Sequence, residues 1–169
     1  MHTEIRLLTP DDTDALVRLR REALESEPLA FSASLEDDRG LDADFVRQSL
    51  AETRDSAVFG AFSPGLVGMV GVYRDPQRKA AHKAHIWGMF VQPAFRQSGI
   101  GDDLFSAAIR HVRGMPRVSQ VHLGVSETAE PARRLYERHG FKVWGTEPCA
   151  LSYREHLVAE HHMVLMLER

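Results

Sequence analysis

The stretch QPAFRQSGIGDDLF, residues 92–105, joins an apolar run that predicts a strand to an amphipathic run that predicts a helix. The strand, residues 85–91, stops at Pro93, and the turn that follows contains Gly99 and Gly101. Glycines permit unusual backbone dihedrals and let an anion approach the main chain closely. Unpaired N–H groups and the positive end of the helix dipole favour phosphate at such a helix N-terminus. The stretch therefore predicts a turn that binds a pyrophosphate.

Composition and charge place the chain among ordinary globular proteins. It has 169 residues, of which 43 % are hydrophobic and 27 % are charged, so residues 1–169 are expected to form a single domain around one core. The formal net charge of −3 provides no basic field, so neither nucleic acid nor an anionic membrane is expected as a partner. Cys149 is the single cysteine, which excludes an internal disulfide and suits a reducing compartment.

The hydropathy of the chain predicts no targeting or membrane segment. The first residues, MHTEIRLLTPDD, lack a basic segment followed by a long apolar core, so no signal peptide is expected. No apolar run approaches the roughly 20 residues that a membrane-spanning helix needs. A cytoplasmic location is therefore the expectation.

Hydrophobic periodicity and turn residues predict alternating strands and helices without repeats or linkers. Strands are expected at residues 4–8, 57–63, 66–73, 85–91, 118–125, 141–144 and 163–167, and helices at 13–24, 43–53, 102–113 and 130–138. The strand, helix and strand around the phosphate turn imply a parallel pair, whereas the hairpin before them implies antiparallel pairing. The sequence therefore predicts an α/β (α+β) fold with a mixed sheet.

Several other site types lack their defining residues. No Gly-Lys-Ser/Thr follows the turn, which argues against a P-loop, and residues 99–101 lack the third glycine of a dinucleotide fold. No later strand ends in the acidic residue that such a fold requires. Four histidines do not follow the spacing of a closed zinc site, so no metal is expected at His82, His85, His161 or His162.

Two motifs resemble those of one known family. The segments VQP (residues 91–93) and RQSGIG (96–101) resemble the acetyl-coenzyme A loop of the GNAT family of N-acetyltransferases. Further along, PARRLYERHGF (131–141) is similar to the family's Ala-x-x-Leu-Tyr-x-x-x-Gly-Phe helix. A predicted strand separates the two motifs, as in the family, and the order of elements agrees over nearly the whole chain.

The resemblance implies a mostly antiparallel mixed sheet, flanked by helices, in which one parallel strand pair is splayed. Acetyl-coenzyme A would be the cosubstrate, with its pantetheine lying as a pseudo-strand between the strand ending at Val91 and the strand ending near Val125. Backbone groups of Met89, Phe90 and Val91 would pair with the pantetheine amides. The loop would hold the pyrophosphate through the main chain of Gln97, Ser98, Gly99, Ile100 and Gly101, and Arg96 would add charge.

The resemblance also suggests how the chemistry is divided. Tyr136 is the expected general acid, because a phenol with a pKa near ~10 can donate to a leaving thiolate whose ordinary pKa is ~8.5. A backbone N–H near Phe90 is the expected donor to the oxyanion. His85 is the first candidate for the base that deprotonates the amine, and Glu127 and Glu147 near strand ends are others.

One departure from the family pattern leaves a second function open. Ala129 stands where many members carry Asn, so the side-chain contact to the cofactor is either missing or supplied by Ser126 or Thr128. The first prediction is an N-acetyltransferase that moves acetyl to a primary amine by direct attack in a ternary complex. Cys149 lies outside both motifs, which disfavours an acyl-cysteine route. The alternative is a non-catalytic module that senses acyl-coenzyme A.

The acceptor and the assembly are constrained only loosely. In the family the acceptor binds between the segments that correspond here to residues 26–40 and 145–160, and both contain acidic and aromatic residues. Acidic lining would suit a cationic amine, either a small molecule or a peptide, although these acids would equally suit solvated loops. Homodimers are common in the family, so a homodimer is one expected assembly.

Overall fold

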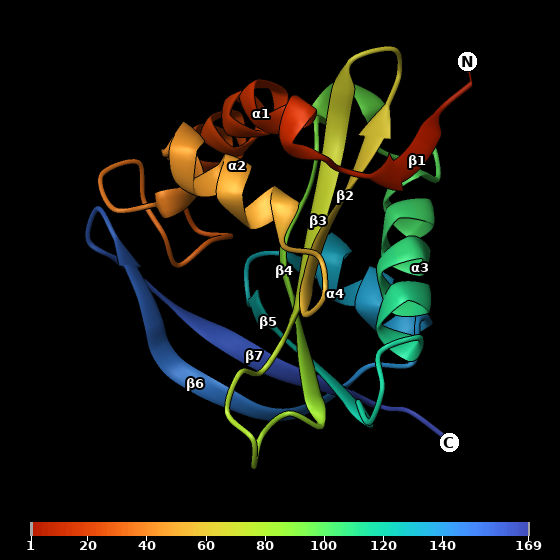
Figure 1. Ribbon diagram of the computed structural model, residues 1–169. Helices are drawn as coiled ribbons and strands as arrows, with labels where there is room; N and C mark the ends of the chain where they lie inside the picture. Colours follow the sequence, from red (N-terminus) through yellow and green to blue (C-terminus); the bar gives the residue numbers. More distant parts are fainter. Residues whose placement is uncertain (1, 169) are drawn as a thin grey trace.

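Residues 2–168 are described in the computed structural model, and their elements follow the predicted order (Figure 1). The strands are β1 (Glu4–Leu7), β2 (Ser56–Phe62), β3 (Leu66–Arg74), β4 (Lys83–Val91), β5 (Gln120–Ser126), β6 (Lys142–Tyr153) and β7 (His156–Met166). The helices are α1 (Thr13–Ser26), α2 (Ala43–Ala51), α3 (Ile100–Arg113) and α4 (Glu130–Arg138), and short 3₁₀ turns occupy η1 (Pro10–Asp12), η2 (Arg39–Leu41) and η3 (Pro93–Phe95). Within residues 2–168, no helix combines the length and apolar character needed to cross a bilayer.

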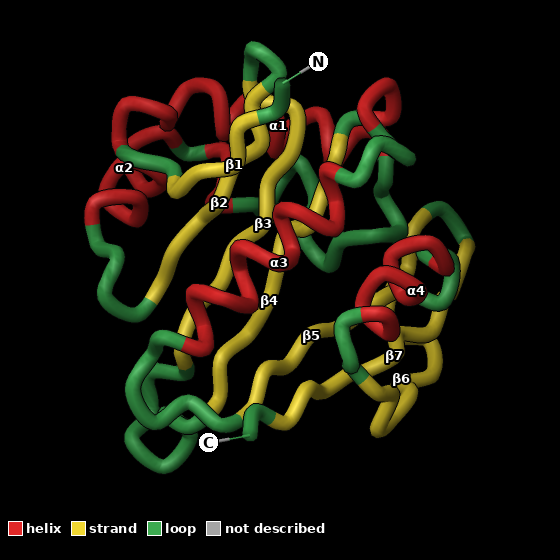
Figure 2. Tube along the Cα trace, turned by 90° about the vertical axis from the view of Figure 1, so that its right-hand side faces the viewer, coloured by secondary structure: helices red, strands yellow, loops and turns green. Residues whose placement is uncertain are grey.

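The strands form one sheet in the order β1-β2-β3-β4-β5-β7-β6, in which β4 and β5 are parallel and the other neighbours are antiparallel. Helices α1 and α2 cover one face of the sheet, and α3 and α4 cover the other (Figures 1 and 2). A large core that includes Phe105 and Val121 fills the α3–α4 side, and a smaller one that includes Leu16 and Met69 lies under α1 and α2. The predicted mixed fold is confirmed.

The parallel pair separates soon after it forms. β4 and β5 are paired only at Lys83–Gln120, Ala84–Val121 and His85–His122, and beyond that point the two strands diverge (Figure 2). A β-bulge accompanies the divergence, because the pairing of β3 with β4 skips one extra residue of β4 around Gly88, whose φ is +65°. The strand edges that face each other across the gap therefore lack sheet partners.

The prediction for the last two strands was wrong in length. Residues 141–144 and 163–167 were expected to be short strands, but β6 and β7 run for 12 and 11 residues and form a long hairpin. β6 is the outer strand of the sheet, and most of its residues are exposed, so no alternation of apolar and polar residues marks it. Pro148 interrupts its ladder where the register shifts between Glu147 and Leu151.

The start of α1 is fixed by a carboxylate that binds two elements at once. Asp12 accepts a hydrogen bond from the Thr9 N–H at 2.8 Å and two from the Arg6 guanidinium, at 2.8 and 2.9 Å. The Arg6 hydrogen bonds lower the pKa of Asp12 to about 2, against the opposing effect of its burial. Arg6 is on β1, so the carboxylate ties the first strand to the first helix.

We expect Asp12→Asn to destabilise the protein by about 2 kcal/mol at neutral pH, because the folded state lowers the pKa of the carboxyl. A lowered pKa contributes stability above the unfolded value near 3.8, and that contribution is lost as pH falls toward 2. Urea unfolding of both proteins at neutral pH and at about pH 3 measures the difference. Asp11→Asn, at the exposed neighbouring position, is the control. An equal loss of stability at both pH values would contradict the assignment.

Candidate functional site

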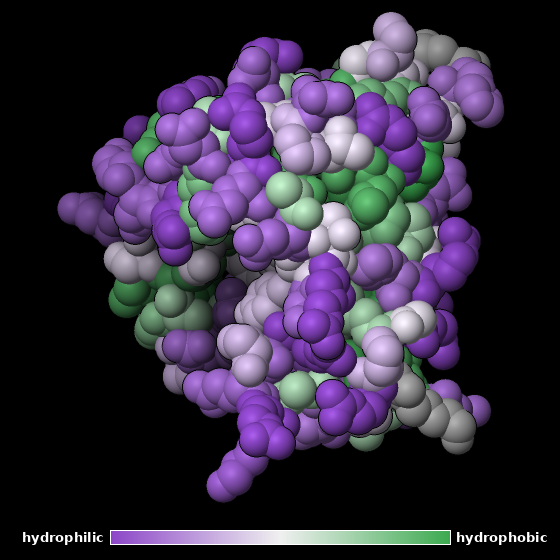
Figure 3. Space-filling model, viewed as in Figure 1, coloured by the Kyte–Doolittle hydropathy of each residue, from purple (hydrophilic) through white to green (hydrophobic). Residues whose placement is uncertain are grey.

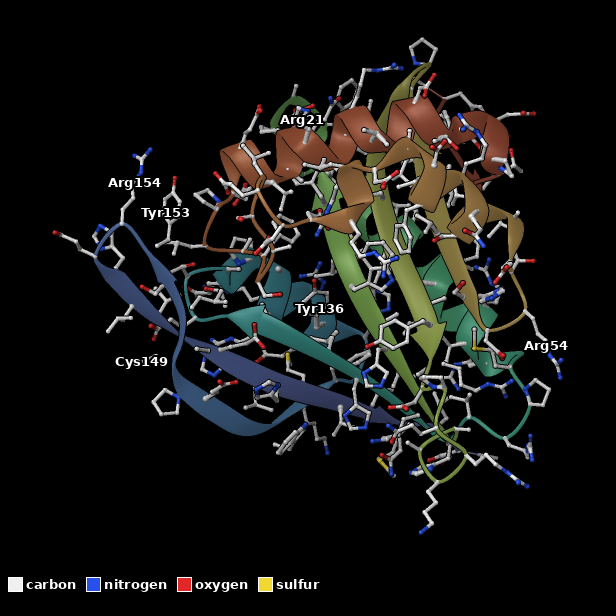
Figure 4. All side chains as sticks on the ribbon, turned by 60° about the vertical axis from the view of Figure 1, so that its left-hand side comes forward. Arg21, Arg54, Tyr136, Cys149, Tyr153 and Arg154 are labelled. Carbon is white, nitrogen blue, oxygen red and sulfur yellow. The ribbon has the colours of Figure 1, made fainter. Side chains whose placement is uncertain are left out.

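A hollow occupies the gap between β4 and β5. Its walls are the β4 residues around Gly88, the β5 residues 123–126, the N-terminal part of α4 and residues 30–31 after α1. Tyr136 of α4 closes it from the α3–α4 side, and Figure 4 shows this side chain behind the gap. On the opposite side, Figure 3 shows the surface hollowed between the α1–α2 layer and the β6–β7 hairpin. The hollow is therefore closed toward α3 and α4 and open on the α1–α2 side of the sheet.

Tyr136 is held in place by aromatic packing. The residue is 6 % exposed, and its ring centroid lies 5.0 Å from that of Phe105 and 6.4 Å from that of Phe141. Burial raises the pKa of its phenol well above the ordinary value. The hydroxyl therefore stays protonated at neutral and moderately alkaline pH, and it can donate a hydrogen bond into the hollow.

The turn before α3 presents a row of free main-chain donors. Between residues 97 and 102, no amide has an acceptor among the described atoms of the protein. Gln97 and Gly99 have φ values of 60° and 87°, which direct successive N–H groups toward one side of the turn. The N-terminus of α3, a helix of 14 residues, adds the positive end of its dipole. Free amides beside a helix N-terminus are compatible with a bound diphosphate, and diphosphate binding at this turn stays a prediction.

Arg96 is engaged with the protein itself. Its Nε donates to the Val91 carbonyl at 2.8 Å, and its Nη2 donates to Glu27 at 2.7 Å. Gln92, at the start of the same turn, donates to Glu22 of α1 at 2.7 Å. These contacts tie the turn to the end of β4 and to α1, so the structure gives Arg96 a role in shaping the turn.

Among the other residues predicted to contact the cofactor, some have side chains in the hollow and some have side chains that are buried or bonded elsewhere. Met89 lines the hollow, whereas the side chains of Phe90 and Val91 are buried in the cores on opposite faces of the sheet. The side chain of Ile100 is buried as well. Ser98 donates its hydroxyl to the Phe95 carbonyl at 2.5 Å. For Phe90, Val91, Ser98 and Ile100, a contact to the cofactor would therefore have to come from the main chain.

His85 lies at the vertex of the gap, on the face opposite to Tyr136. It belongs to the last residue pair that joins β4 to β5, and it lines a second hollow with Trp87, Trp144 and His162. Its Nε2 is 3.3 Å from Asp75, and its ring stacks on Tyr73 with centroids 4.7 Å apart. The structure therefore does not bring His85 and Tyr136 together, but places one on each side of the sheet.

Comparison with known proteins identifies the family. A family model described as "Acetyltransferase (GNAT) family" matches residues 16–141. The chain belongs to the GNAT acetyltransferase family. Its members transfer an acetyl group from acetyl-coenzyme A, and the structure of yncA from Salmonella typhimurium, determined with its cofactor acetyl-CoA, has this fold. That similarity has a TM-score of 0.86 at 17 % identity and covers 100 % of this chain and 96 % of that one.

Two sequence relatives carry the same activity in their names. The serotonin N-acetyltransferase of Pan troglodytes is 28 % identical over 175 residues, which is 96 % of this chain and 78 % of that protein. The N-alpha-acetyltransferase of Sulfolobus acidocaldarius is 28 % identical over 141 residues, which is 82 % of this chain and 79 % of that protein. The chain is thus a GNAT N-acetyltransferase, and acetyl-coenzyme A is its cosubstrate.

The departure from the GNAT pattern at Ala129 leaves a nearby hydroxyl pair. Ala129 is the N-cap of α4 and lines the hollow together with Ser126 at the end of β5. Ser126 is 2 % exposed, and its Oγ is 2.9 Å from the Thr128 hydroxyl. Of the two residues considered as substitutes for the missing amide, Ser126 is therefore the one that faces the hollow.

The other candidate bases are engaged elsewhere. Glu127 accepts a hydrogen bond from the Ala159 N–H at 2.8 Å, at the junction of β5 and β7. Glu147, on β6, lies 3.2 Å from His162. Together with Glu160, Glu147 and His162 place one ligand atom each within 4.8 Å of one another. Glu127 is thus fixed by the strand junction, and Glu147 by its histidine partner.

Two features of the site were not predicted from the sequence. Glu160 packs its carboxylate over Gly124, so close that a Cβ on Gly124 would be 2.5 Å from its Oε1. Arg20 and Asp38 form a buried ion pair beside Gly88, with Nε and Oδ2 2.5 Å apart. A glycine inside β5 was the only local sequence feature that indicated the packing of Glu160 on Gly124. No local sequence pattern links Arg20 with Asp38.

We expect Gly99→Ala to raise the Kd for acetyl-coenzyme A about tenfold, the equivalent of one weakened charge-assisted hydrogen bond. The residue has a φ of 87°, and open space surrounds it, so the strain is conformational and changes the turn rather than the core. Calorimetric titration with acetyl-coenzyme A measures the affinity. Gly145→Ala is the matched control, because open space surrounds that glycine too but its φ is not positive. Equal affinities for Gly99→Ala and the native protein would show that the turn does not hold the diphosphate.

Proposed function

We propose that the chain transfers acetyl directly from acetyl-coenzyme A to a primary amine in a ternary complex, with Tyr136 as general acid. One observation carries the proposal: the hollow between the unpaired edges of β4 and β5 has the protonated hydroxyl of Tyr136 on its wall. The names of the relatives favour catalysis over the alternative of an acyl-coenzyme A sensor.

The proposed binding mode assigns the cosubstrate to the main chain. The amides of Gln97, Ser98, Gly99, Ile100 and Gly101 bind the diphosphate, and those of Met89, Phe90 and Val91 pair with the pantetheine. Free edges on β4 and β5 support this assignment, because buried backbone groups need partners. Arg96 acts by holding the turn between Val91 and Glu27.

The proposed reaction forms one N–C bond and breaks one C–S bond. A backbone N–H near Phe90 stabilises the negative charge that develops on the carbonyl oxygen as the neutral amine attacks. The electron pair of the breaking bond goes to sulfur, and Tyr136 donates its proton there. The raised pKa of Tyr136 keeps that proton in place before the reaction and favours its return from solvent afterwards.

The amine must lose one proton before it attacks and a second once the N–C bond has formed. His85, which returns the first proton to solvent, is the proposed acceptor of both. His85 and Asp75 form a histidine–carboxylate pair that orients the ring. Hydrogen bonds from the Gln77 N–H and from His85 outweigh the burial of Asp75 and keep its pKa below the ordinary value, so it is ionised at neutral pH. Burial and neighbouring positive charges lower the pKa of His122 beside it, which favours a neutral ring there.

The acceptor is proposed as a small-molecule or peptide amine, and two further properties are proposed with it. One relative is named for serotonin, which is a primary amine, and another is named an N-alpha-acetyltransferase. A homodimer is supported by the exposed apolar side chains Trp144, Leu157 and Met166 on the outer hairpin. A cytoplasmic location is supported by Cys149, a free and exposed thiol. We propose that residues 1–169 act as a single domain.

We expect Tyr136→Phe to lower kcat about 100-fold while leaving the Kd for acetyl-coenzyme A nearly unchanged, because the ring packing is retained and the proton donor is lost. Release of free thiol in the presence of a panel of primary amines measures kcat. Tyr153→Phe, on the exposed hairpin in Figure 4, is the control.

Two results would contradict this assignment. Full activity of Tyr136→Phe would remove Tyr136 from the reaction. Tight binding of acetyl-coenzyme A by the native protein, without thiol release for any amine, would establish the sensor instead.

We expect His85→Gln to lower kcat/KM, because the variant side chain cannot accept the proton that the amine must lose. The loss at neutral pH should be about 100-fold, the lower bound for general base catalysis. No alkaline decline from Tyr136 is expected below about pH 10, because its pKa is raised. His156→Gln, at an exposed position of the hairpin, is the control. An unchanged kcat/KM in His85→Gln would assign the base to another group.

A further inference from the structure

A separate pocket of about 350 Å³, distinct from the two hollows described above, lies between α2 and the face of β2 and β3. Its walls are mainly apolar, with Val46 and Leu50 of α2 opposite Val58 and Val72 of the sheet. Trp87 lines both this pocket and the hollow that Tyr136 closes. The pocket therefore adjoins the hollow between β4 and β5.

A buried guanidinium lies where the pocket meets the hollow. The side chain of Arg20 is 9 % exposed, and its Nε pairs with Asp38. Its Nη1 is buried and has no hydrogen-bond partner within residues 2–168. This atom would lie 3.7 Å from a Cβ on Gly88, at the bulge of β4. The ring centroids of Phe31 and Trp87 lie 4.9 and 5.9 Å from the guanidinium carbon of Arg20.

An unpaired donor on a buried guanidinium is costly unless a ligand accepts its hydrogen bond. Asp38 already neutralises the charge of Arg20, so a carboxylate placed there would leave an uncompensated negative charge in an apolar site. An uncharged oxygen, such as a carbonyl, satisfies the donor without adding charge. Because Nη1 lies beside Gly88, that oxygen must be near the reacting amino group.

We propose that the acceptor is a primary amine with an apolar body and an uncharged oxygen close to the amino group. This inference rests on the proposed function, since it names the acceptor of the same reaction. The body fills the pocket between α2 and β3, Arg20 donates to the oxygen through Nη1, and the amino group passes Trp87 into the gap between the splayed strands.

Four amines separate the elements of this proposal. Phenylalaninamide has the body and the uncharged carbonyl, phenethylamine lacks the carbonyl, phenylalanine replaces it with a carboxylate, and glycinamide lacks the body. Thiol release measures kcat/KM for each. We expect kcat/KM for phenylalaninamide to be about 10- to 100-fold higher than for glycinamide, because its ring is buried. It should be about tenfold higher than for phenethylamine and phenylalanine, because only phenylalaninamide accepts the hydrogen bond from Arg20 through an uncharged oxygen.

Two variants test the residues behind that preference. Arg20→Lys keeps the charge beside Asp38 but removes the planar donors, so the advantage of phenylalaninamide over phenethylamine should fall to about 1. Arg21→Lys, at the exposed neighbouring position on α1 (Figure 4), is its control. Ser49→Leu adds bulk to the wall of the pocket, so it should lower kcat/KM for phenylalaninamide relative to glycinamide about tenfold. Gln48→Leu, which makes the same residue on the outer side of α2, should leave that ratio unchanged.

The outcomes distinguish this inference from the function on which it rests. Equal kcat/KM for glycinamide and phenylalaninamide would show that the pocket does not bind the apolar body of the acceptor. A preference for phenylalanine would show that the oxygen bound by Arg20 is charged. A phenylalaninamide preference that survives in Arg20→Lys would remove Arg20 from recognition. If no amine releases thiol although acetyl-coenzyme A binds, the proposed function itself fails. Should Arg20→Lys fail to fold, the comparison of Ser49→Leu with Gln48→Leu still decides whether the pocket holds the acceptor.

Discussion

The separation of β4 from β5 is the constraint on which the rest of the site depends. Two parallel strands that pair at only three residue positions leave the facing backbone groups of their later residues without partners. Buried N–H and C=O groups are almost always hydrogen-bonded, so a gap of this kind favours an occupant that can pair along it. An extended chain with amide groups meets that requirement. The unpaired backbone groups along β4 and β5 destabilise the open sheet. A strand-like ligand that forms hydrogen bonds with them gains affinity for that reason.

Other features of the fold keep the gap from closing. The extra residue of β4 around Gly88 bends the strand, and Tyr136, packed against Phe105, occupies the α4 side. On the other side, Arg20 and Phe31 reach the bulge from α1 and from the segment after it. Each of these groups is buried or tied to a neighbour, so the opening is formed by well-packed elements and does not depend on flexible loops.

The sequence predicted the elements whose signals are local. The turn at residues 96–101 and the helix that contains Tyr136 have motifs with fixed spacing, and the structure shows both with the expected geometry. The order of strands and helices was also correct, because apolar periodicity marks every element that has a buried face. The boundaries were less accurate, since α3 begins at Ile100 and not at Asp102.

The features that the sequence did not reveal depend on contacts between distant segments or on exposed residues. The hairpin of β6 and β7 lacks periodicity because its outer strand has no buried face. The pairing of Arg20 with Asp38 bridges 18 residues across the end of α1, and the packing of Glu160 on Gly124 requires the register of β5 against β7. Neither follows from spacing along the chain.

The positions of the proposed acid and base favour one route of acetyl transfer. His85 and Tyr136 lie on opposite faces of the sheet, so the proposed acceptor of the amine proton and the proposed proton donor to sulfur are separate groups. An acyl-cysteine route would need a thiol within reach of both faces of the gap, but Cys149 is exposed on the outer strand β6. An amine that enters from the face of His85 can instead attack directly while the thiol leaves on the side of Tyr136. The net proton then moves between the two faces through solvent, because no described side chain links His85 to Tyr136 by hydrogen bonds.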